Sequence, residues 1–134
     1  MSLYVQTNQP ILLPDADYTV GTVDTGKIFI FTTVTALRTI TLPLPAAGLH
    51  YKFINKAPGA LGAAGQNVRI LGGVLSFYGL VEMYNTVLVI DGAANGINFI
   101  ATASLRGDNL DLFADGTGWS VMGVGRAIAS FSYT

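Results

Sequence analysis

The 134-residue sequence carries 7 basic and 8 acidic side chains, a formal net charge of −1, so no basic excess favours nucleic acid or an anionic membrane as partner. Charged residues make up only 11% of the chain, against about 25% in ordinary soluble domains, while hydrophobic residues reach 51%. Such a surface exposes apolar area, so we expect other protein chains to cover much of it.

The first 16 residues differ in composition from the rest of the chain. Met1–Pro14 is apolar and free of glycine, and Pro10 and Pro14 favour extended backbone. We interpret residues 1–16 as an extended arm that straps onto a neighbouring subunit or, alternatively, as an edge strand of the chain's own domain. Residues 17–134 are interpreted as one β-sandwich domain. The candidate subunit or capsid contacts in the first segment are Leu3, Tyr4, Ile11 and Leu12.

Strand-forming segments follow one another along the rest of the sequence. They are rich in β-branched and aromatic residues, and none shows the 3.6-residue apolar period of a helix over three turns. Their apolar runs fall far short of the roughly 18 residues of a membrane-spanning helix, so we expect no membrane insertion. The predicted strands are Lys27–Val34, Arg38–Leu44, His50–Lys56, Asn67–Gly73, Tyr84–Ile90, Ile97–Ala103, Leu110–Ala114, Trp119–Val124 and Ala127–Thr134.

Short turns rich in glycine, proline and aspartate separate these strands. Strands at spacings of about ten residues predict an all-β fold: a single-domain antiparallel sandwich, jelly-roll-like, or a small barrel. The Gly/Ala-rich stretch Ala57–Gly65 is predicted to be a flexible loop that can also lie against a neighbouring subunit. The predicted turns are Asp24–Gly26, Pro45–Gly48, Asp91–Gly96 and Asp115–Gly118.

The segment Arg106–Gly123 is predicted to be a structural hairpin. Apolar and polar residues alternate over Leu110–Ala114, and Trp119 begins the second strand, where it can shield an apolar face. The connecting turn contains two glycines that can take positive φ, and aspartates in turns bond their own backbone two residues on. The predicted turn and hairpin residues are Gly107, Asp108, Asp115, Gly116, Gly118 and Trp119.

The same segment contains two patterns that resemble binding motifs. Arg106–Asp108 reads Arg-Gly-Asp, but receptor recognition needs this tripeptide at an exposed loop tip, and here it directly precedes a strand. Asp108, Asp111 and Asp115 do not have the spacing of a calcium loop, and no glutamate follows to close such a site. We therefore expect a strand-entry turn and no metal site.

No other residue suggests catalysis. His50 is the only histidine, and it lies in an alternating strand without a nucleophile motif. Glu82 is the only glutamate, and pairing it with an aspartate for glycoside hydrolysis is the remaining alternative. The chain has no cysteine, which excludes disulfides, thiolate nucleophiles and sulfur-ligated zinc. We expect no enzyme activity and no cofactor.

Aromatic residues concentrate in Ser76–Tyr84. They could form a carbohydrate platform, a subunit contact or an ordinary part of the sandwich core. The candidate contacts from this segment are Phe77, Tyr78 and Tyr84.

The order of several motifs resembles a small β-sandwich module of phage and large-virus structural proteins. These motifs are TITLPLPAAG, YKFINKA, NVRI and LRGDNLDLFADGTGWSVMG, and together they span about Arg38–Gly123. The resemblance implies a capsid decoration or tail-fibre-like surface protein, often trimeric, that acts by adhesion and has no shared catalytic site.

Composition and resemblance together predict a viral structural protein at the virion surface. The first expectation is a homotrimeric capsid decoration or cement subunit whose partners are other capsid or fibre proteins. The alternative is a fibre head or lectin-like module that binds a receptor or a host-surface glycan. An exposed tryptophan or paired exposed tyrosines would favour the alternative, and burial of Trp119 would count against it.

Overall fold

The protein is described here by a computed structural model that covers residues 10–72 and 77–134. These residues form strands, turns and one short 3₁₀ helix, η1 (Thr22–Asp24), and none of them forms a helix that could cross a membrane. The strands are β1 (Ile11–Leu12), β2 (Tyr18–Thr19), β3 (Ile28–Phe31), β4 (Arg38–Thr41), β5 (His50–Asn55), β6 (Val68–Leu71), β7 (Phe77–Met83), β8 (Thr86–Ala94), β9 (Gly96–Phe99), β10 (Asn109–Ala114), β11 (Trp119–Val124) and β12 (Phe131–Tyr133).

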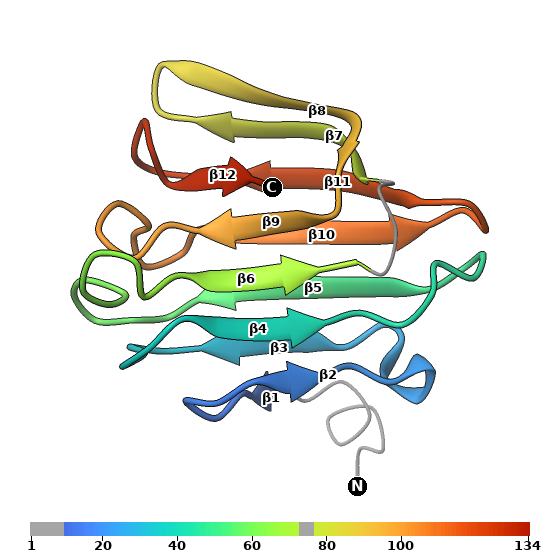
Figure 1. Ribbon diagram of the computed structural model, residues 1–134, viewed down its shortest axis with the longest axis horizontal. Coiled ribbons are helices and arrows are strands. Elements are labelled where there is room, and N and C mark those ends of the chain that lie inside the picture. Colours follow the sequence, from blue (N-terminus) through green and yellow to red (C-terminus); the bar gives the residue numbers. More distant parts are fainter. Residues whose placement is uncertain (1–9, 73–76) are drawn as a thin grey trace, which may run out of the picture.

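The strands form two sheets that lie face to face (Figure 1). The seven-stranded sheet has the order β1-β3-β5-β10-β11-β7-β8, and the five-stranded sheet has the order β12-β9-β6-β4-β2. The β7–β8 hairpin lies at the top of Figure 1, beyond the last strand of the five-stranded sheet. The predicted all-β, single-domain sandwich is therefore confirmed, and the two sheets do not close into a barrel.

The sheets are mixed rather than purely antiparallel. From β1 to β6 the chain passes from one sheet to the other after every strand, so the strands next to each other in a sheet are two apart in sequence. They then run in the same direction: β3 pairs in parallel with β1 and β5, and β4 with β2 and β6. The expected antiparallel order holds for β5-β10-β11, β7–β8 and β6-β9-β12. The strand segments predicted a two-sheet sandwich. They did not predict that successive strands alternate between the two sheets, which makes neighbouring strands parallel.

The region Asp91–Gly96, predicted to be a turn, is instead largely strand. β8 continues to Ala94, and the chain crosses into the five-stranded sheet only at Asn95. The β7–β8 pairing has an irregularity in this region, and Gly92 has a φ of +93° there. A Cβ at Gly92 would lie 2.5 Å from the Tyr78 ring, so glycine serves this close approach instead of ending the strand.

Several predicted strands are shorter than expected. The strand predicted at Tyr84–Ile90 begins at Thr86, because Tyr84 and Asn85 form the β7–β8 turn and Asn85 has a φ of +58°. The one predicted at Ala127–Thr134 is a strand only over Phe131–Tyr133. Ala57–Gly65 is a loop, as predicted, and it is anchored by the fully buried Ala57 and Leu61.

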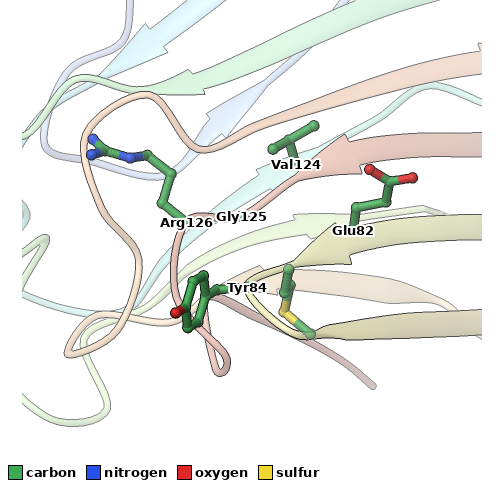
Figure 2. A pocket seen from close by; sticks show the side chains of 6 residues that line it. Glu82, Tyr84, Val124, Gly125 and Arg126 are labelled. Carbon is green, nitrogen blue, oxygen red and sulfur yellow. The ribbon is translucent and has the colours of Figure 1, made fainter.

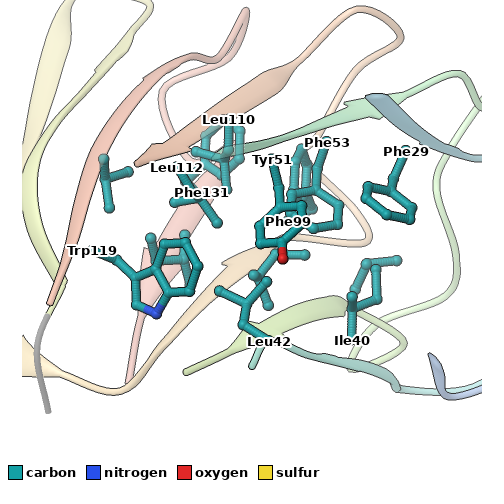
Figure 3. Close-up of a cluster of buried hydrophobic side chains, with 14 of the residues drawn as sticks. Phe29, Ile40, Leu42, Tyr51, Phe53, Phe99, Leu110, Leu112, Trp119 and Phe131 are labelled. Atoms are coloured by element: carbon teal, nitrogen blue, oxygen red, sulfur yellow. The ribbon is translucent and has the colours of Figure 1, made fainter. Parts of the chain in front are cut away.

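Aromatic side chains from both sheets fill the space between them (Figure 3). The ring centroids of Phe29 and Phe53 are 5.2 Å apart in a stacked pair, and those of Phe31 and Phe99 are 4.7 Å apart in an edge-to-face pair. The ring centroid of Trp119 lies 5.8 Å from that of Tyr51. Such pairs add about 0.5–1.5 kcal/mol each to the burial of their area. The core therefore joins strands that are far apart in the sequence.

Candidate interaction surface

The β10–β11 hairpin has the architecture expected of Arg106–Gly123. Its strands pair from Asn109–Val124 to Ala114–Trp119. Asp115 Oδ1 accepts hydrogen bonds from Thr117 N, Thr117 Oγ1 and Gly118 N at 2.8–2.9 Å, and these bonds lower the pKa of the carboxyl. Gly116 has a φ of +97°, whereas Gly118 is not among the glycines with positive φ, so one glycine rather than two supplies that conformation.

Asp108 is a buried structural group. Its carboxylate accepts hydrogen bonds from Ser104 Oγ at 3.0 Å, Leu105 N at 2.8 Å and Arg126 N at 2.9 Å, and the residue is fully buried. The aspartate therefore bonds backwards to its own loop and across to the loop after β11, not two residues on as expected. A receptor cannot reach this carboxylate, so Arg106–Asp108 is not available as an adhesion signal.

Of the residues considered for catalysis, His50 belongs to a small polar group with Lys52 and Asp111 on β5 and β10, whereas Glu82 lies apart from it on β7. His50 Nε2 lies 3.4 Å from Asp111 Oδ1, and Lys52 Nζ lies 3.2 Å from Asp111 Oδ2. The His50 ring stacks on Phe113 with a centroid distance of 4.2 Å. No cluster of three or more metal-ligating side chains occurs among residues 10–72 and 77–134. The geometry of this group is that of a partly exposed ion pair supported by an aromatic ring.

The outer faces of the two sheets differ in chemistry. On the five-stranded sheet, Thr39, Arg69, Asn98 and Ser132 occupy one cross-strand row. Asn98 Oδ1 accepts a hydrogen bond from Arg69 Nε, and its Nδ2 donates one to Ser132 Oγ, both at 3.1 Å. This row is hydrogen-bonded within the sheet and has a polar surface.

The outer face of β11, β7 and β8 carries an apolar patch. Strand alternation turns Val81 and Val121 into the core, and their neighbours in sequence therefore point outwards. The patch residues expose from 49% of their surface for Val124 to 60% for Met122. We call this set the apolar patch: Tyr78, Leu80, Val87, Val89, Met122 and Val124.

The apolar patch reaches the edge of its sheet. Val87 and Val89 belong to β8, which pairs with β7 on one side and has no other partner strand within the described chain. An edge strand presents unpaired backbone donors and acceptors beside its side chains. An apolar face and an open edge therefore adjoin at β8.

The candidate contact residues lie in different environments. Tyr78 belongs to the apolar patch, and Tyr84 is exposed at the β7–β8 turn. Ile11 and Leu12 form the edge strand β1, where Leu12 is exposed and Ile11 is partly buried. Phe77 is fully buried against the core, which corrects its assignment as a contact. Leu3 and Tyr4 lie outside the described residues.

Most of the apolar patch was absent from the candidate residues. Leu80, Val87, Val89, Met122 and Val124 were missed. The signal that could have found them is a strand that is apolar at both alternating sets of positions although only one face can meet the core, as in Thr86–Ile90 and Trp119–Val124.

Trp119 is not part of any exposed surface. It is fully buried and lies between the sheets with its ring centroid 5.8 Å from that of Tyr51.

Comparison with known proteins gave no match to a family model, to a curated protein or to a solved structure. The site is therefore described by its own geometry.

Proposed function

We propose that this chain is a viral structural protein, a capsid decoration or cement subunit that assembles as a homotrimer at the virion surface. The observation that carries the proposal is the apolar patch, which is exposed in a chain with only 11% charged residues. Removing apolar area from water is favourable by about 25 cal/mol per Å², from which the entropic cost of association is subtracted. On this proposal the chain acts by adhesion, without catalysis and without a cofactor.

The arrangement of the molecule supports this role in two further ways. The hydrogen-bonded polar row on the five-stranded sheet and the apolar patch on the seven-stranded sheet give the two outer faces of the sandwich different chemistry. The order of strand and turn motifs over about Arg38–Gly123 also resembles that of small virion surface modules. A subunit that coats a shell needs this two-sided character.

Association with virus particles tests the proposal. Particles purified from the source of this chain are labelled with an antibody against it, and stripped particles are incubated with the purified chain and sedimented. We expect labelling of the particle surface and saturable cosedimentation. Particles that carry no label and do not bind the chain would exclude the virion-surface role.

The fibre-head alternative depends on exposed aromatic side chains. Tyr78 and Tyr84 expose 54% and 61% of their surfaces, which suits sugar stacking, whereas the buried Trp119 contributes nothing to such a site. Screening the purified chain against a glycan array tests the alternative. Binding that is lost in Tyr78→Ala or Tyr84→Ala would favour the fibre head over the decoration protein.

A further inference from the structure

Two carboxylates associated with the apolar patch have no cationic partner. Glu82 lies between patch residues, paired in register with Val87 and Val124, and Asp91 pairs with Tyr78. Other carboxylates form ion pairs, such as that of Asp111 with Lys52, but neither Glu82 nor Asp91 lies within 4.0 Å of a cationic group in the described chain. The apolar patch is thus accompanied by two negative charges, those of Glu82 and Asp91, that no cation of the described chain pairs with.

A second surface has the opposite charge and is also partly apolar. The loop before β10 and the loop after β11 are tied together because Arg126 Nη1 donates to the Arg106 carbonyl at 3.1 Å. Gly107 N donates to the Asn55 carbonyl at 2.7 Å, which ties the loop before β10 to the end of β5. Leu105 and Ile128 on these loops expose 41% and 59% of their surfaces. We call this surface the basic end: Lys56, Leu105, Arg106, Arg126 and Ile128.

The positive charges of the basic end have no ion-pair partner among the described residues. Lys56, Arg106 and Arg126 are all exposed and form no ion pair in the described residues. Asp108 lies beneath them, but its carboxylate is buried and already accepts three hydrogen bonds. The basic end therefore presents unpaired positive charge beside exposed aliphatic side chains.

The two surfaces meet at a corner but do not pair within one molecule. Glu82 and Arg126 both line an open hollow of about 440 Å³ beside the β7–β8 turn. Their side chains diverge from one another, and no ion pair joins them (Figure 2). The Glu82 carboxylate and the Arg126 guanidinium can therefore each form an ion pair with a second molecule, although they form none with each other.

We propose that the apolar patch of one copy docks on the basic end of a second copy. This inference rests on the proposed function in that it names the neighbour that covers the adhesive face. Patch against patch would bring Glu82 and Asp91 of both copies together without a cation, which like-charge repulsion disfavours. Patch against basic end instead joins aliphatic side chains to aliphatic side chains and carboxylates to guanidinium groups.

The contact is also suited to closed assembly. It joins two different surfaces of the chain, and repeating such a contact closes a ring when the rotation between copies permits. The β8 edge then lies inside the assembly instead of remaining open to unlimited strand pairing. The partner is therefore a second copy, recognised through opposite charge and matching apolar side chains.

Charge reversal at the two surfaces tests the contact. The mass of the full chain is measured by light scattering over a dilution series, for the wild type, Glu82→Arg, Arg126→Glu and the double variant. We expect an oligomer for the wild type and a dissociation constant raised about tenfold or more in each single variant. The double variant should recover the dissociation constant of the wild type. Arg106→Glu, at the same end, should weaken assembly as Arg126→Glu does.

Controls separate a docking effect from misfolding and from net charge. Arg69→Glu makes the same change in net charge as Arg126→Glu, but on the outer face of the five-stranded sheet, and should leave assembly unchanged. Circular dichroism should show the same strand content in every variant. A wild-type monomer, or single reversals without effect, or a double variant that does not recover, would overturn the inference.

The outcome is distinguishable from a failure of the proposed function. A chain that stays monomeric but still coats particles would refute the contact between copies and leave the virion role standing. Assembly that follows the charge swap in a chain absent from particles would refute the virion role and leave the contact standing.

Discussion

The buried carboxylate of Asp108 allows a direct measurement of what burial adds to a hydrogen-bonded turn. Asp108 and Asp115 each accept three hydrogen bonds of 2.8–3.0 Å, but Asp108 is fully buried and Asp115 is exposed. The two aspartates therefore form a matched pair within one segment. We predict that replacing them with alanine has very different effects on the free energy of unfolding.

The magnitude follows from the groups that each substitution leaves behind. Asp108→Ala deprives two backbone amides, those of Leu105 and Arg126, and the Ser104 hydroxyl of their acceptor in a dry site. An unsatisfied buried donor costs about 1–3 kcal/mol, so we expect a loss of about 3–5 kcal/mol. Water can replace the lost carboxylate of the exposed Asp115, so Asp115→Ala should lower the free energy of unfolding much less.

Urea unfolding followed by the fluorescence of Trp119, the only tryptophan and fully buried, measures both changes. All variants are compared at one protein concentration, because self-association shifts apparent stability. An intermediate loss is expected for Asp108→Asn, which keeps one acceptor oxygen. Equal losses in the two alanine variants, or a loss below about 0.5 kcal/mol for Asp108→Ala, would refute the argument from burial.

Three further predictions concern other parts of the sandwich. Hydrogen bonds from Arg38 and then Thr35 lower the pKa of Asp15 from 3.8 to about 2, so these contacts add stability above about pH 4 that is lost as the pH falls towards 2. NMR titration should place the midpoint near 2, and Asp15→Asn should reduce the loss of stability that urea unfolding measures as the pH is lowered from 4 to 2. Gly79→Ala should cost more than about 3 kcal/mol, seen as a lowered urea midpoint or insoluble expression, because its Cβ would lie 2.0 Å from the Val121 carbonyl oxygen at a φ of +148°. Tyr51→Phe removes a 2.9 Å hydrogen bond to a loop carbonyl and should cost about 1 kcal/mol, a few degrees in thermal midpoint, whereas an unchanged midpoint would mean that the bond contributes nothing.

The positions of the strands were largely predictable because strand formation depends on local sequence. Period-two alternation in His50–Lys56 and Leu110–Ala114 has a direct counterpart in β5 and β10, whose residues alternate between partly exposed and buried positions. The strand β7 (Phe77–Met83) was not predicted, and one further error arose because glycine occurs both in turns and within strands. Gly116 does form a tight turn, but Gly92 lies within β8 and makes room for a tyrosine ring.

Pairing partners and surfaces could not be predicted in the same way. β1, β3 and β5 are parallel neighbours only because intervening strands belong to the opposite sheet, and no local pattern records that crossing. The apolar patch was missed for a related reason. Val87 and Val89 resemble core residues in sequence, and only the folded arrangement shows that they lie on the outer face of the seven-stranded sheet, which no described part of the chain covers.

The amino-acid sequence alone determined that this chain builds strands, that tight glycine turns connect them and that too few charges cover the result. These properties depend on neighbouring residues, backbone sterics and composition, which act before the chain is folded. Tertiary structure alone decided that the Asp108 carboxylate lies in the interior and that the outer face of β11, β7 and β8 carries an apolar patch. It also decided that Glu82 and Arg126 line one hollow without forming an ion pair. The position of each side chain there depends on the pairing of strands that are far apart in the sequence.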